Sequence, residues 1–362
     1  MNYLEAREYL DRVSLCGSIP GLDSIRILLH ELGDPQDRLR FVHIAGTNGK
    51  GSVMAYLASI LKEAGYRVGR YVSPTLFCYE ERIQINGVYI SQEDVARMTG
   101  RIAAARSAIE QRGEAMSTVF EMETAMSFLY FAEKDCDLVL LETGMGGRED
   151  ATNVVTTSIL EIISSISMDH MQFLGTTLSE IAWHKAGIMK PGTPVVSDLQ
   201  QPEAAEVLED ECRQKRGELC FCDPGRIANI RYGIYEQSFD YAPVILRHAD
   251  SEAFHGYSAD HKELRDLRIH MAGTCQIRNA ALALEAAGAL IRLGYRILPE
   301  HIRNGLEHTV WEGRFQVLHR RPMIIIDGAH NPDAAIVLMD AVNTYFDTKK
   351  IYYCFGVFSE KE

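Results

Sequence analysis

The sequence predicts an α/β protein with a P-loop-type, doubly wound and mainly parallel sheet, a small β extension and a second, smaller Rossmann-like α/β domain. The first observation is that short apolar runs alternate with segments of helical period along the chain, which favours a parallel sheet. The second is that apolar runs end in loops rich in glycine or polar residues after positions 45, 72, 142 and 167. Because such sheets bind ligands outside the carboxyl ends of their strands, we expect these loops to form one binding rim.

The composition is that of an ordinary globular protein. The 362 residues, 46% of them hydrophobic and 24% charged, are enough for two domains. No apolar run approaches the roughly 18 residues needed to span a bilayer. The amino terminus, MNYLEAREYL, lacks the basic and then apolar pattern of a secretory signal. We therefore expect a cytoplasmic protein without a membrane partner.

The charge and the cysteines exclude two further classes. A formal net charge of -13 argues against a nucleic acid partner, because binding to a polyanion requires clustered Lys and Arg. The eight cysteines are scattered, without the spacing of a zinc site or the density of a disulfide scaffold. An acidic enzyme can still hold a nucleotide through backbone N–H groups and a bound metal ion.

The elements of the first part of the chain follow from local patterns. Each predicted strand is a short apolar run that closes at a glycine or polar loop, and each predicted helix repeats apolar residues every three or four positions. Asn86-Gly87 is a strong signal for a hairpin turn. In order, we predict strands at 39–45, 67–72, 137–142, 160–166 and 193–197, and helices at 52–64, 92–112, 121–134, 177–185 and 276–293.

The remaining segments form the β extension and the second domain. Short strands and turns are predicted over 226–271. After Gly294, strands at 323–327 and 351–355 read as parallel, with a helix between them. Two strands are few for an open α/β sheet, so we expect the second domain to be incomplete. The predicted domains are residues 1–294 and 295–362.

The segment GTNGKGS at 46–52 resembles a phosphate-binding loop but departs from the common pattern G-x-x-x-x-G-K-[ST]. That pattern would require glycine in place of Ile44 and Ser or Thr in place of Gly51. The features that bind phosphate remain. Glycines let a phosphate come close to the backbone, consecutive N–H groups can form an anion nest, and a helix begins beside them. Lys50 can reach the phosphates, and Ser52 supplies a hydroxyl. Taken alone, the loop fits a nucleotide site and a simple turn equally well.

Three other residues of the rim are candidates for chemistry. Glu142 ends a buried strand, where a carboxylate can bind Mg²⁺ or can equally cap a helix or pair with a cation. His170 follows Asp169 after another strand and would more often be an ordinary polar residue than a ligand. Lys185 lies on the next helix and, judged alone, reads as a solvated lysine.

Eight segments, taken together, resemble the signatures of the folylpolyglutamate synthase and dihydrofolate synthase family of the Mur ligase superfamily. They occur in the family's order along nearly the whole chain. They are GTNGKGS (46–52), SPTLFCYEERIQING (73–87), FEMETAMSFLYF (120–131), LLETGMGGREDATN (140–153), SMDHMQFLGTTLSEIAWHKAGIMKPG (167–192), GTCQIRNAALALEA (273–286), EGRFQV (312–317) and IDGAHNPDA (326–334).

This resemblance implies an ATP-dependent amide ligase. In the family, ATP phosphorylates a carboxylate of the pterin substrate to an acyl phosphate, and the amine of L-glutamate then displaces phosphate. Activation is needed because a carboxylate is a poor electrophile until its oxygen becomes a leaving group, and charge neutralisation should carry the phosphoryl step. The resemblance makes residues 1–294 the ATP-binding domain and implies ATP, Mg²⁺ at two sites, L-glutamate and dihydropteroate or a reduced folate as ligands.

The resemblance also assigns roles to individual residues. Lys50, Lys185, His170 and His330 are the expected catalytic residues, with His330 near the incoming glutamate and Lys185 carboxylated by CO₂ to a carbamate. The expected ATP contacts are Gly46, Thr47, Asn48, Gly49, Lys50, Gly51, Ser52, Asn279, Arg314 and Asp327. The expected Mg²⁺ ligands are Ser73, Glu142, His170 and carbamylated Lys185. The expected pterin contacts are Thr118, Phe120, Glu121, Asp150 and Ala151.

The sequence departs from the family pattern at two places. Thr75 stands where the family often has histidine, which affects substrate contacts, and Cys275 stands where it often has histidine next to Gln276, which affects the adenine side. Neither change removes an expected metal ligand.

The leading hypothesis is a monomeric, bifunctional enzyme that acts on dihydropteroate and on reduced folates. A folylpolyglutamate synthase without the dihydropteroate activity, and a non-catalytic ATP-binding relative, stay open. A cell-wall Mur ligase is disfavoured by REDATN and FEMETA.

Overall fold

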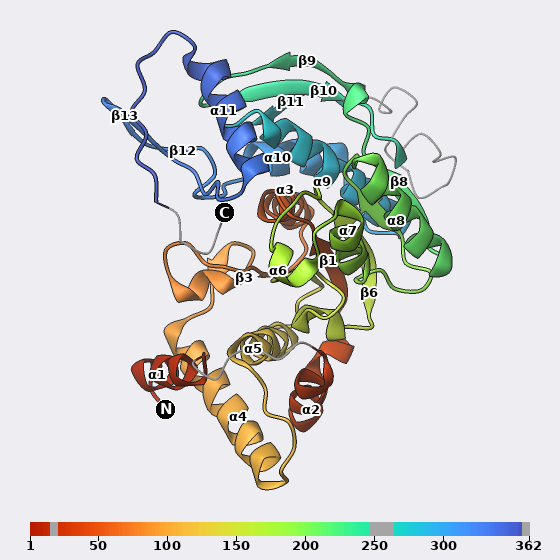
Figure 1. The fold of residues 1–362 in the computed structure, drawn as a ribbon, viewed down its shortest axis with the longest axis vertical. Coiled ribbons are helices and arrows are strands. Elements are labelled where there is room, and N and C mark those ends of the chain that lie inside the picture. The colour runs from red at the N-terminus through yellow and green to blue at the C-terminus, as the bar shows by residue number, and fades with distance from the viewer. Residues whose placement is uncertain (15–20, 246–263, 357–362) are drawn as a thin grey trace.

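The computed structural model describes residues 1–14, 21–245 and 264–356, and an eight-stranded mixed sheet forms its centre (Figure 1). The strand order is β4-β3-β2-β5-β1-β6-β7-β8. The strands from β2 to β8 in this order are parallel, and the β3–β4 hairpin adds antiparallel to the edge at β2. The sheet strands are β1 (Phe41–Ala45), β2 (Val68–Tyr71), β3 (Ile83–Ile85), β4 (Val88–Tyr89), β5 (Leu138–Glu142), β6 (Ser158–Ile163), β7 (Val195–Ser197) and β8 (Leu219–Phe221).

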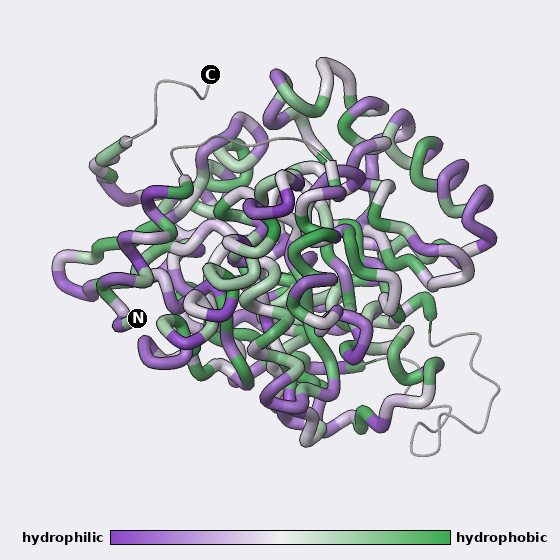
Figure 2. Tube along the Cα trace, turned by 90° about the horizontal axis from the view of Figure 1, so that it is seen from below, coloured by the Kyte–Doolittle hydropathy of each residue, from purple (hydrophilic) through white to green (hydrophobic). Residues whose placement is uncertain are grey.

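Helices cover both faces of this sheet, as the prediction of a doubly wound fold requires. Alternate residues of the strands face opposite sides, so Val42 and Ile44 belong to one apolar cluster and Phe41 to another. Figure 2 shows apolar segments gathered in the middle of the molecule. The first face carries α3 (Lys50–Glu63), α9 (Cys275–Arg292) and α10 (Pro299–Glu307). The second carries α1 (Tyr3–Ser14), α2 (Asp23–Glu31), α4 (Gln92–Gln111), α5 (Val119–Glu133), α7 (Leu178–Ala186) and α8 (Pro202–Gln214).

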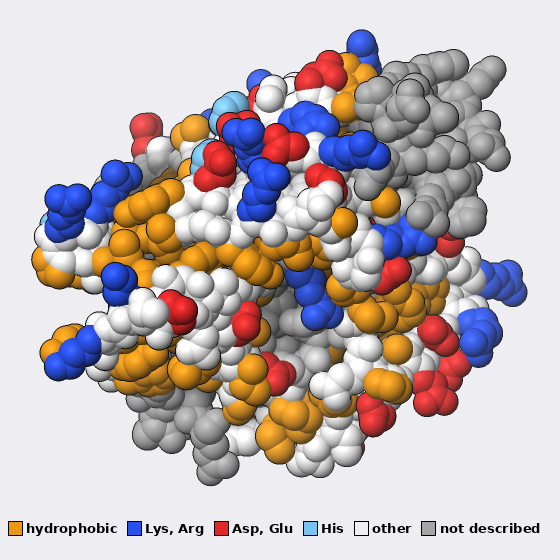
Figure 3. Space-filling view, turned by 90° about the horizontal axis from the view of Figure 1, so that it is seen from above, with side chains coloured by type: hydrophobic (Ala, Val, Ile, Leu, Met, Phe, Trp, Pro, Cys, Tyr) orange, Lys and Arg blue, Asp and Glu red, His pale blue; other side chains and the backbone are white. Residues whose placement is uncertain are grey.

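On the face drawn in Figure 3, Lys and Arg are interspersed with Asp and Glu. Among the described residues, none of the helices is both long enough and apolar enough to cross a membrane.

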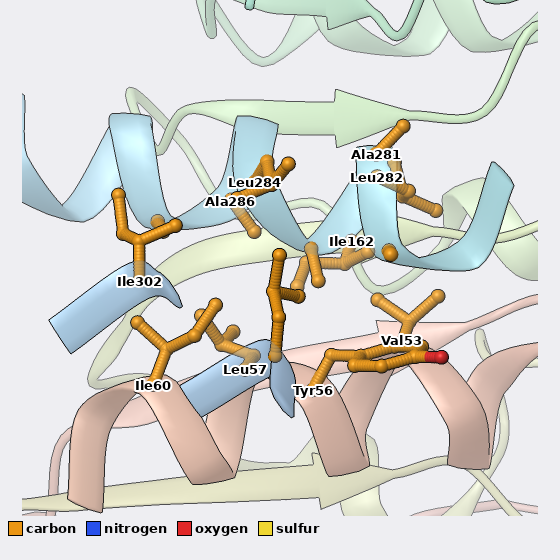
Figure 4. Close-up of a cluster of buried hydrophobic side chains, with 14 of the residues drawn as sticks. Val53, Tyr56, Leu57, Ile60, Ile162, Ala281, Leu282, Leu284, Ala286 and Ile302 are labelled. Atoms are coloured by element: carbon orange, nitrogen blue, oxygen red, sulfur yellow. The ribbon is translucent and has the colours of Figure 1, made fainter. Parts of the chain in front are cut away.

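The cluster between α3, α9 and α10 is the core on which the phosphate loop rests. Tyr56, Leu57 and Ile60 of α3 are fully buried against apolar residues of α9 and α10 (Figure 4). Full burial of one such side chain contributes about 1.5–3 kcal/mol, so this packing fixes the position of α3 and of the loop at its amino end.

Helix α10 completes this core even though it follows residue 294. Gly305 packs so closely on α3 that a Cβ atom there would lie 2.5 Å from Ile60 Cα. Ile302 and Leu306 are buried in the same cluster. The domain boundary at residue 294 itself stays a prediction.

The predicted β extension is a three-stranded antiparallel sheet of order β11-β10-β9. Part of the predicted extension, residues 246–263, lies outside the described residues. The strands are β9 (Ile227–Arg231), β10 (Gln237–Tyr241) and β11 (Leu264–Ile269).

The second domain differs from the prediction in two ways. Strand β13 (Met323–Ile326) pairs antiparallel with β12 (Gln316–Arg320), a strand that the sequence analysis missed, and α11 (Pro332–Phe346) follows. The predicted strand at 351–355 is wrong, because that described segment has no regular structure. An apolar run predicts burial, whereas a strand also needs a neighbour with which to form hydrogen bonds. A short connection at residues 321–322 supplies such a neighbour for β13.

Candidate active site

The phosphate loop connects β1 to α3, as predicted, but not all of its N–H groups are free for an anion. Gly49 precedes the helix with a φ of 91°, in the left-handed region that favours glycine. The N–H groups of Thr47 and Asn48 donate to the carbonyl oxygen of Ser165, at 2.7 and 3.4 Å. This anchors the loop to the segment after β6. The N–H groups left for a phosphate are those of the first turn of α3, which have no acceptor within the helix.

Trp311 accounts for the unusual glycine between Lys50 and Ser52. A Cβ atom on Gly51 would lie 2.9 Å from Cζ2 and Nε1 of the Trp311 indole, which is closer than such contacts normally allow. The hydroxyl residue of the common pattern would meet this ring. The loop is therefore a phosphate loop whose sequence is adapted to a tryptophan from the segment before β12.

We expect Gly51→Ala to weaken ATP binding roughly tenfold, since overpacking costs about 1–3 kcal/mol and 1.4 kcal/mol is a factor of ten. ATP affinity by titration calorimetry and thermal unfolding would measure the effect. Gly100→Ala is the matched control, because Gly100 lies within α4 with open space at its Cβ position. That control should preserve ATP affinity and stabilise the helix slightly. Equal ATP affinity in Gly51→Ala and the wild type would contradict the proposed role of the contact.

Two lysines converge on one backbone oxygen of this loop. Lys50 Nζ and Lys185 Nζ each lie 2.9 Å from the carbonyl oxygen of Gly46 and donate to it. Burial lowers the pKa of Lys50, against the opposing effect of Glu142. Burial and the nearby charge of Lys50 lower the pKa of Lys185 to about 7. A lysine that looked solvated in the sequence is thus buried, and a substantial fraction of it is a neutral amine at neutral pH.

The residues expected to bind Mg²⁺ come from three loops around these lysines. Glu142 is buried, and its pKa is raised by burial, while Lys50, Arg314 and a hydrogen bond from the Ser73 backbone oppose that rise. His170 lies on the loop after β6, where its Nε2 is 4.0 Å from Asp169 Oδ1. Within the described residues there is no cluster of three or more His, Cys, Asp or Glu side chains suited to a metal.

This donor set fits Mg²⁺ bound together with a nucleotide. Mg²⁺ prefers oxygen ligands and usually keeps one or two protein carboxylates, with phosphate and water oxygens completing its octahedron. A buried carboxylate such as Glu142, hydrogen-bonded to the Ser73 backbone, meets that requirement without a dense cluster. The assignment of the individual ligands stays a prediction.

A cavity of about 360 Å³ borders the phosphate loop on the side of the second domain. Asn279, Arg314 and Asp327, predicted to contact ATP, all line it together with Gly49 and Ser52. The carboxylate of Asp327 accepts from the N–H groups of Phe315 and Ala329, both at 2.8 Å, and so joins two loops of the second domain. The structure therefore brings these predicted ATP residues together around one space.

A second cavity of about 490 Å³ contains the residues predicted to contact the pterin. The Phe120 ring lies against Gly144 at its wall, since a Cβ atom on that glycine would be 2.6 Å from Phe120 Cζ. Thr118 and Glu121 also have a structural role, because they form a reciprocal capping box at the start of α5. The other predicted pterin contacts that line this cavity are Thr118, Glu121, Asp150 and Ala151. Ser73, predicted as an Mg²⁺ ligand, lines it too.

Asp150 is held by a buried hydrogen-bond chain that begins on the central strand. Its Oδ1 accepts from the Thr152 hydroxyl at 2.6 Å, and its Oδ2 accepts from the Met145 N–H at 2.8 Å. Burial raises the pKa of Asp150, while hydrogen bonds from Thr152, Met145 and Gly144 oppose that rise. When the carboxylate is ionised it has no proton to give, so the Thr152 hydroxyl donates to it and accepts from His43 Nε2, at 2.8 Å. Burial lowers the pKa of His43, so its ring is neutral with the proton on Nε2. The chain fixes the carboxylate that faces the second cavity.

Thr152→Val should raise the KM for the pterin substrate roughly tenfold and leave the KM for ATP unchanged, because a lost buried hydrogen bond costs about 1–3 kcal/mol. Initial rates at varied substrate would measure both constants. Thr152→Ser keeps the hydroxyl and should restore the wild-type KM. If both variants merely lower the active fraction, with an unchanged KM, the chain has only a structural role.

The sequence analysis missed a set of side-chain hydrogen bonds between the two domains. The side-chain amides of Asn48 and Asn331 exchange hydrogen bonds of 3.3 and 3.1 Å, and Asn331 Nδ2 also lies 3.2 Å from Asp169 Oδ2. Asn331 is the N-cap of α11, and its neighbour His330 places Nε2 4.0 Å from the same Asp169 oxygen. The sequence signal was the Asn-Pro step at 331–332, which is typical of a helix start. It gave no indication of the partner.

Two family profiles match the chain. The Mur ligase middle domain matches residues 44–287. The profile of the glutamate ligase domain of Mur ligases matches residues 313–362.

Curated relatives match along almost the whole chain. A dihydrofolate synthase/folylpolyglutamate synthase of Bacillus subtilis is 37% identical, over 99% of this chain and 80% of its own length. A folylpolyglutamate synthase of Lacticaseibacillus casei is 32% identical, over 100% of this chain and 81% of its own length.

Solved structures agree with these matches. An FPGS–AMPPCP–folate complex superposes with a TM-score of 0.85 at 32% identity, covering 97% of this chain and 82% of that one. A Mycobacterium tuberculosis folylpolyglutamate synthase, complexed with ADP and AMPPCP, superposes with a TM-score of 0.82 at 31% identity. The match covers 95% of this chain and 74% of that one.

Proposed function

The chain belongs to the folylpolyglutamate synthase/dihydrofolate synthase family of Mur ligases, and on this premise we propose that it is a bifunctional ligase, which adds L-glutamate to dihydropteroate and to reduced folates. As a member of this family it is an ATP-dependent folate–glutamate ligase. The observation that carries the proposal is the position of the phosphate loop. It borders a cavity lined by the ATP candidates, and a separate cavity is lined by Asp150 and Phe120.

In the proposed reaction, a carboxylate oxygen of the pterin substrate attacks the γ-phosphorus of ATP, and ADP leaves. The N–H groups at the start of α3 and the Lys50 ammonium stabilise the charge on the phosphates. Arg314 lies close enough to act electrostatically on Lys50 and Glu142, so it adds a second cation at this point. The amine of L-glutamate then attacks the acyl carbon, phosphate leaves, and the nitrogen loses a proton.

Mg²⁺, held by Glu142 and Ser73 with His170, would neutralise the phosphate oxygens when bound. We further propose that Lys185 is carbamylated. The ammonium first loses one proton, which the lowered pKa favours, and the neutral amine then adds to CO₂ and releases a second proton, so that a buried cation becomes an anion. The anion removes the repulsion between Lys185 and Lys50 and provides oxygen ligands for a second Mg²⁺.

The pterin is proposed to bind in the second cavity, where Asp150 accepts hydrogen bonds from its ring and Phe120 packs against it. Thr118, Glu121 and Ala151 form the surrounding wall. His330 is proposed to contact L-glutamate, since it lies on the second-domain loop that faces Asp169.

Release of phosphate from ATP by the purified protein tests the proposal. The assay contains L-glutamate and either dihydropteroate or tetrahydrofolate, and mass spectrometry identifies the glutamylated product. Activity with both pterins supports the bifunctional enzyme. Activity with tetrahydrofolate alone identifies a folylpolyglutamate synthase, as the Lacticaseibacillus casei relative is named. ATP binding without product from either pterin would indicate a non-catalytic relative.

We also propose that the protein is a cytoplasmic monomer. Light scattering coupled to size-exclusion chromatography checks the oligomeric state, and cell fractionation checks the location.

A further inference from the structure

A partly buried arginine near the phosphate loop forms no ion pair within the described residues. Arg70 lies on β2, and its Nη2 donates to Oε1 of Gln84, the residue opposite it on β3. Its Nε is buried and has no hydrogen-bond partner. In the parts of the chain that the structure describes, this guanidinium forms no ion pair with a carboxylate. A neutral amide satisfies one N–H without neutralising the charge, and Glu142 and Tyr89 act on it only electrostatically, so the desolvation of the cation is only partly compensated.

The Arg70 guanidinium lines a cavity of about 300 Å³ between α3, β2, the loop after β2 and residues 308–312. Its carbon lies 4.7 Å from the centroid of the Trp311 ring, which holds the fork in one orientation. The indole Nε1 of Trp311 is also buried without a partner. The wall therefore combines a cation that has no ion-pair partner with a flat aromatic ring.

The acids of this cavity do not neutralise Arg70. Both oxygens of Glu81 are already engaged, because they accept from the N–H groups of Leu76, Phe77 and Cys78 at 2.7–2.8 Å. Glu312 is exposed to solvent. The cavity is thus suited to a ligand that brings its own negative charge.

We propose that this cavity is a subsite for the carboxylate of a γ-linked glutamyl group, with the Arg70 guanidinium as its principal contact. The inference rests on the proposed ligase function for the identity of the ligand. A planar carboxylate matches the guanidinium fork, which can donate two parallel hydrogen bonds to it. The ligand is either the glutamyl tail of a folate or free L-glutamate.

The position of Trp311 favours the tail. One part of its indole packs on Gly51 of the phosphate loop, and its ring also stacks with Arg70. The ring therefore separates the cavity from the phosphates, so a carboxylate held by Arg70 is not the one that is phosphorylated. A tail with carboxylates spaced along a flexible chain can occupy this subsite while its terminal carboxylate reaches ATP.

Binding to the full chain, without catalysis, tests the subsite. Trp183→Phe leaves Trp311 as the single tryptophan, because the protein has two. Tri-γ-L-glutamate, L-glutamate and the amidated tripeptide are titrated against this variant, with fluorescence and calorimetry as readouts. We expect saturable binding of the acidic tripeptide, none of the amidated one, and at least roughly tenfold weaker binding after Arg70→Gln, equivalent to one lost charged hydrogen bond. Arg101→Gln, on α4, is the matched control and should bind as the parent does.

The outcomes separate the two ligand sources and the two proposals. Saturation by L-glutamate alone, lost in Arg70→Gln, assigns the subsite to the amino acid substrate. Saturation by the tripeptide in a protein that makes no glutamylated product sustains the subsite and refutes the ligase proposal. No saturable binding of either acid, or equal binding with and without Arg70, overturns the inference. In the active enzyme, Arg70→Gln should raise the KM for triglutamylated folate more than that for the monoglutamate.

Discussion

Replacing Lys50 with alanine should reduce phosphate release by at least roughly a hundredfold, since removing one preorganised charge from a transition state costs about 2.7–4 kcal/mol. The structure revises the reason for expecting the fold to survive. Lys50 is partly buried and not an exposed loop residue, and its Nζ donates to the carbonyl oxygens of Gly46 and Thr47. The Gly46 oxygen still accepts from Lys185 in the variant, so we expect only a modest loss of stability.

Phosphate release at saturating substrates and the unfolding midpoint measure the two effects separately. Lys50→Met keeps the aliphatic stem and removes the charge, so it should be as inactive as the alanine variant. Lys349→Ala, in the exposed segment after α11, is the control for the loss of one lysine and should keep full activity. Near-normal turnover in Lys50→Met would refute the phosphate-binding role.

Lys185→Ala should also abolish amide formation, because it removes both the proposed carbamate and the second metal position. The wild type should contain a carbamate that isotopically labelled bicarbonate introduces and that carbon NMR detects. Lys185→Arg keeps a positive charge and cannot form the carbamate, so it should be equally inactive. A fully active Lys185→Arg enzyme would exclude carbamylation as a requirement.

The pH dependence of this lysine has a definite sign. Its pKa falls from the ordinary 10.5 to about 7 in the folded protein, so the unfolded chain binds more protons between these values. Without the carbamate, the cost of burying the ammonium is therefore fully present below pH 7 and is relieved as the pH rises toward 10.5. Carbamate formation should decline as the pH falls below about 7. Activity in low bicarbonate should decline over the same range, and added bicarbonate should offset part of that decline.

Local patterns predicted most of the central sheet. The strand, loop and helix from β1 to α3 formed where the apolar period and the glycines indicated, and Asn86-Gly87 formed the predicted hairpin. These features depend on residues close together in the chain, so the sequence contains the information for them. The prediction of a strand at 351–355 was wrong for the opposite reason. A strand depends on a neighbouring strand with which to form hydrogen bonds, and periodicity does not reveal that neighbour.

Short motifs and the common edge of parallel strands were enough to identify the family, the phosphate loop and the loops that meet at the rim. The contacts of those residues became clear only from the folded chain. It placed Trp311 on Gly51, a buried Lys185 beside Lys50, and His43 behind Asp150. These contacts join residues far apart in the chain, and their charges depend on burial. Both are properties of how helices pack on the sheet, which the order of residues along the chain does not display.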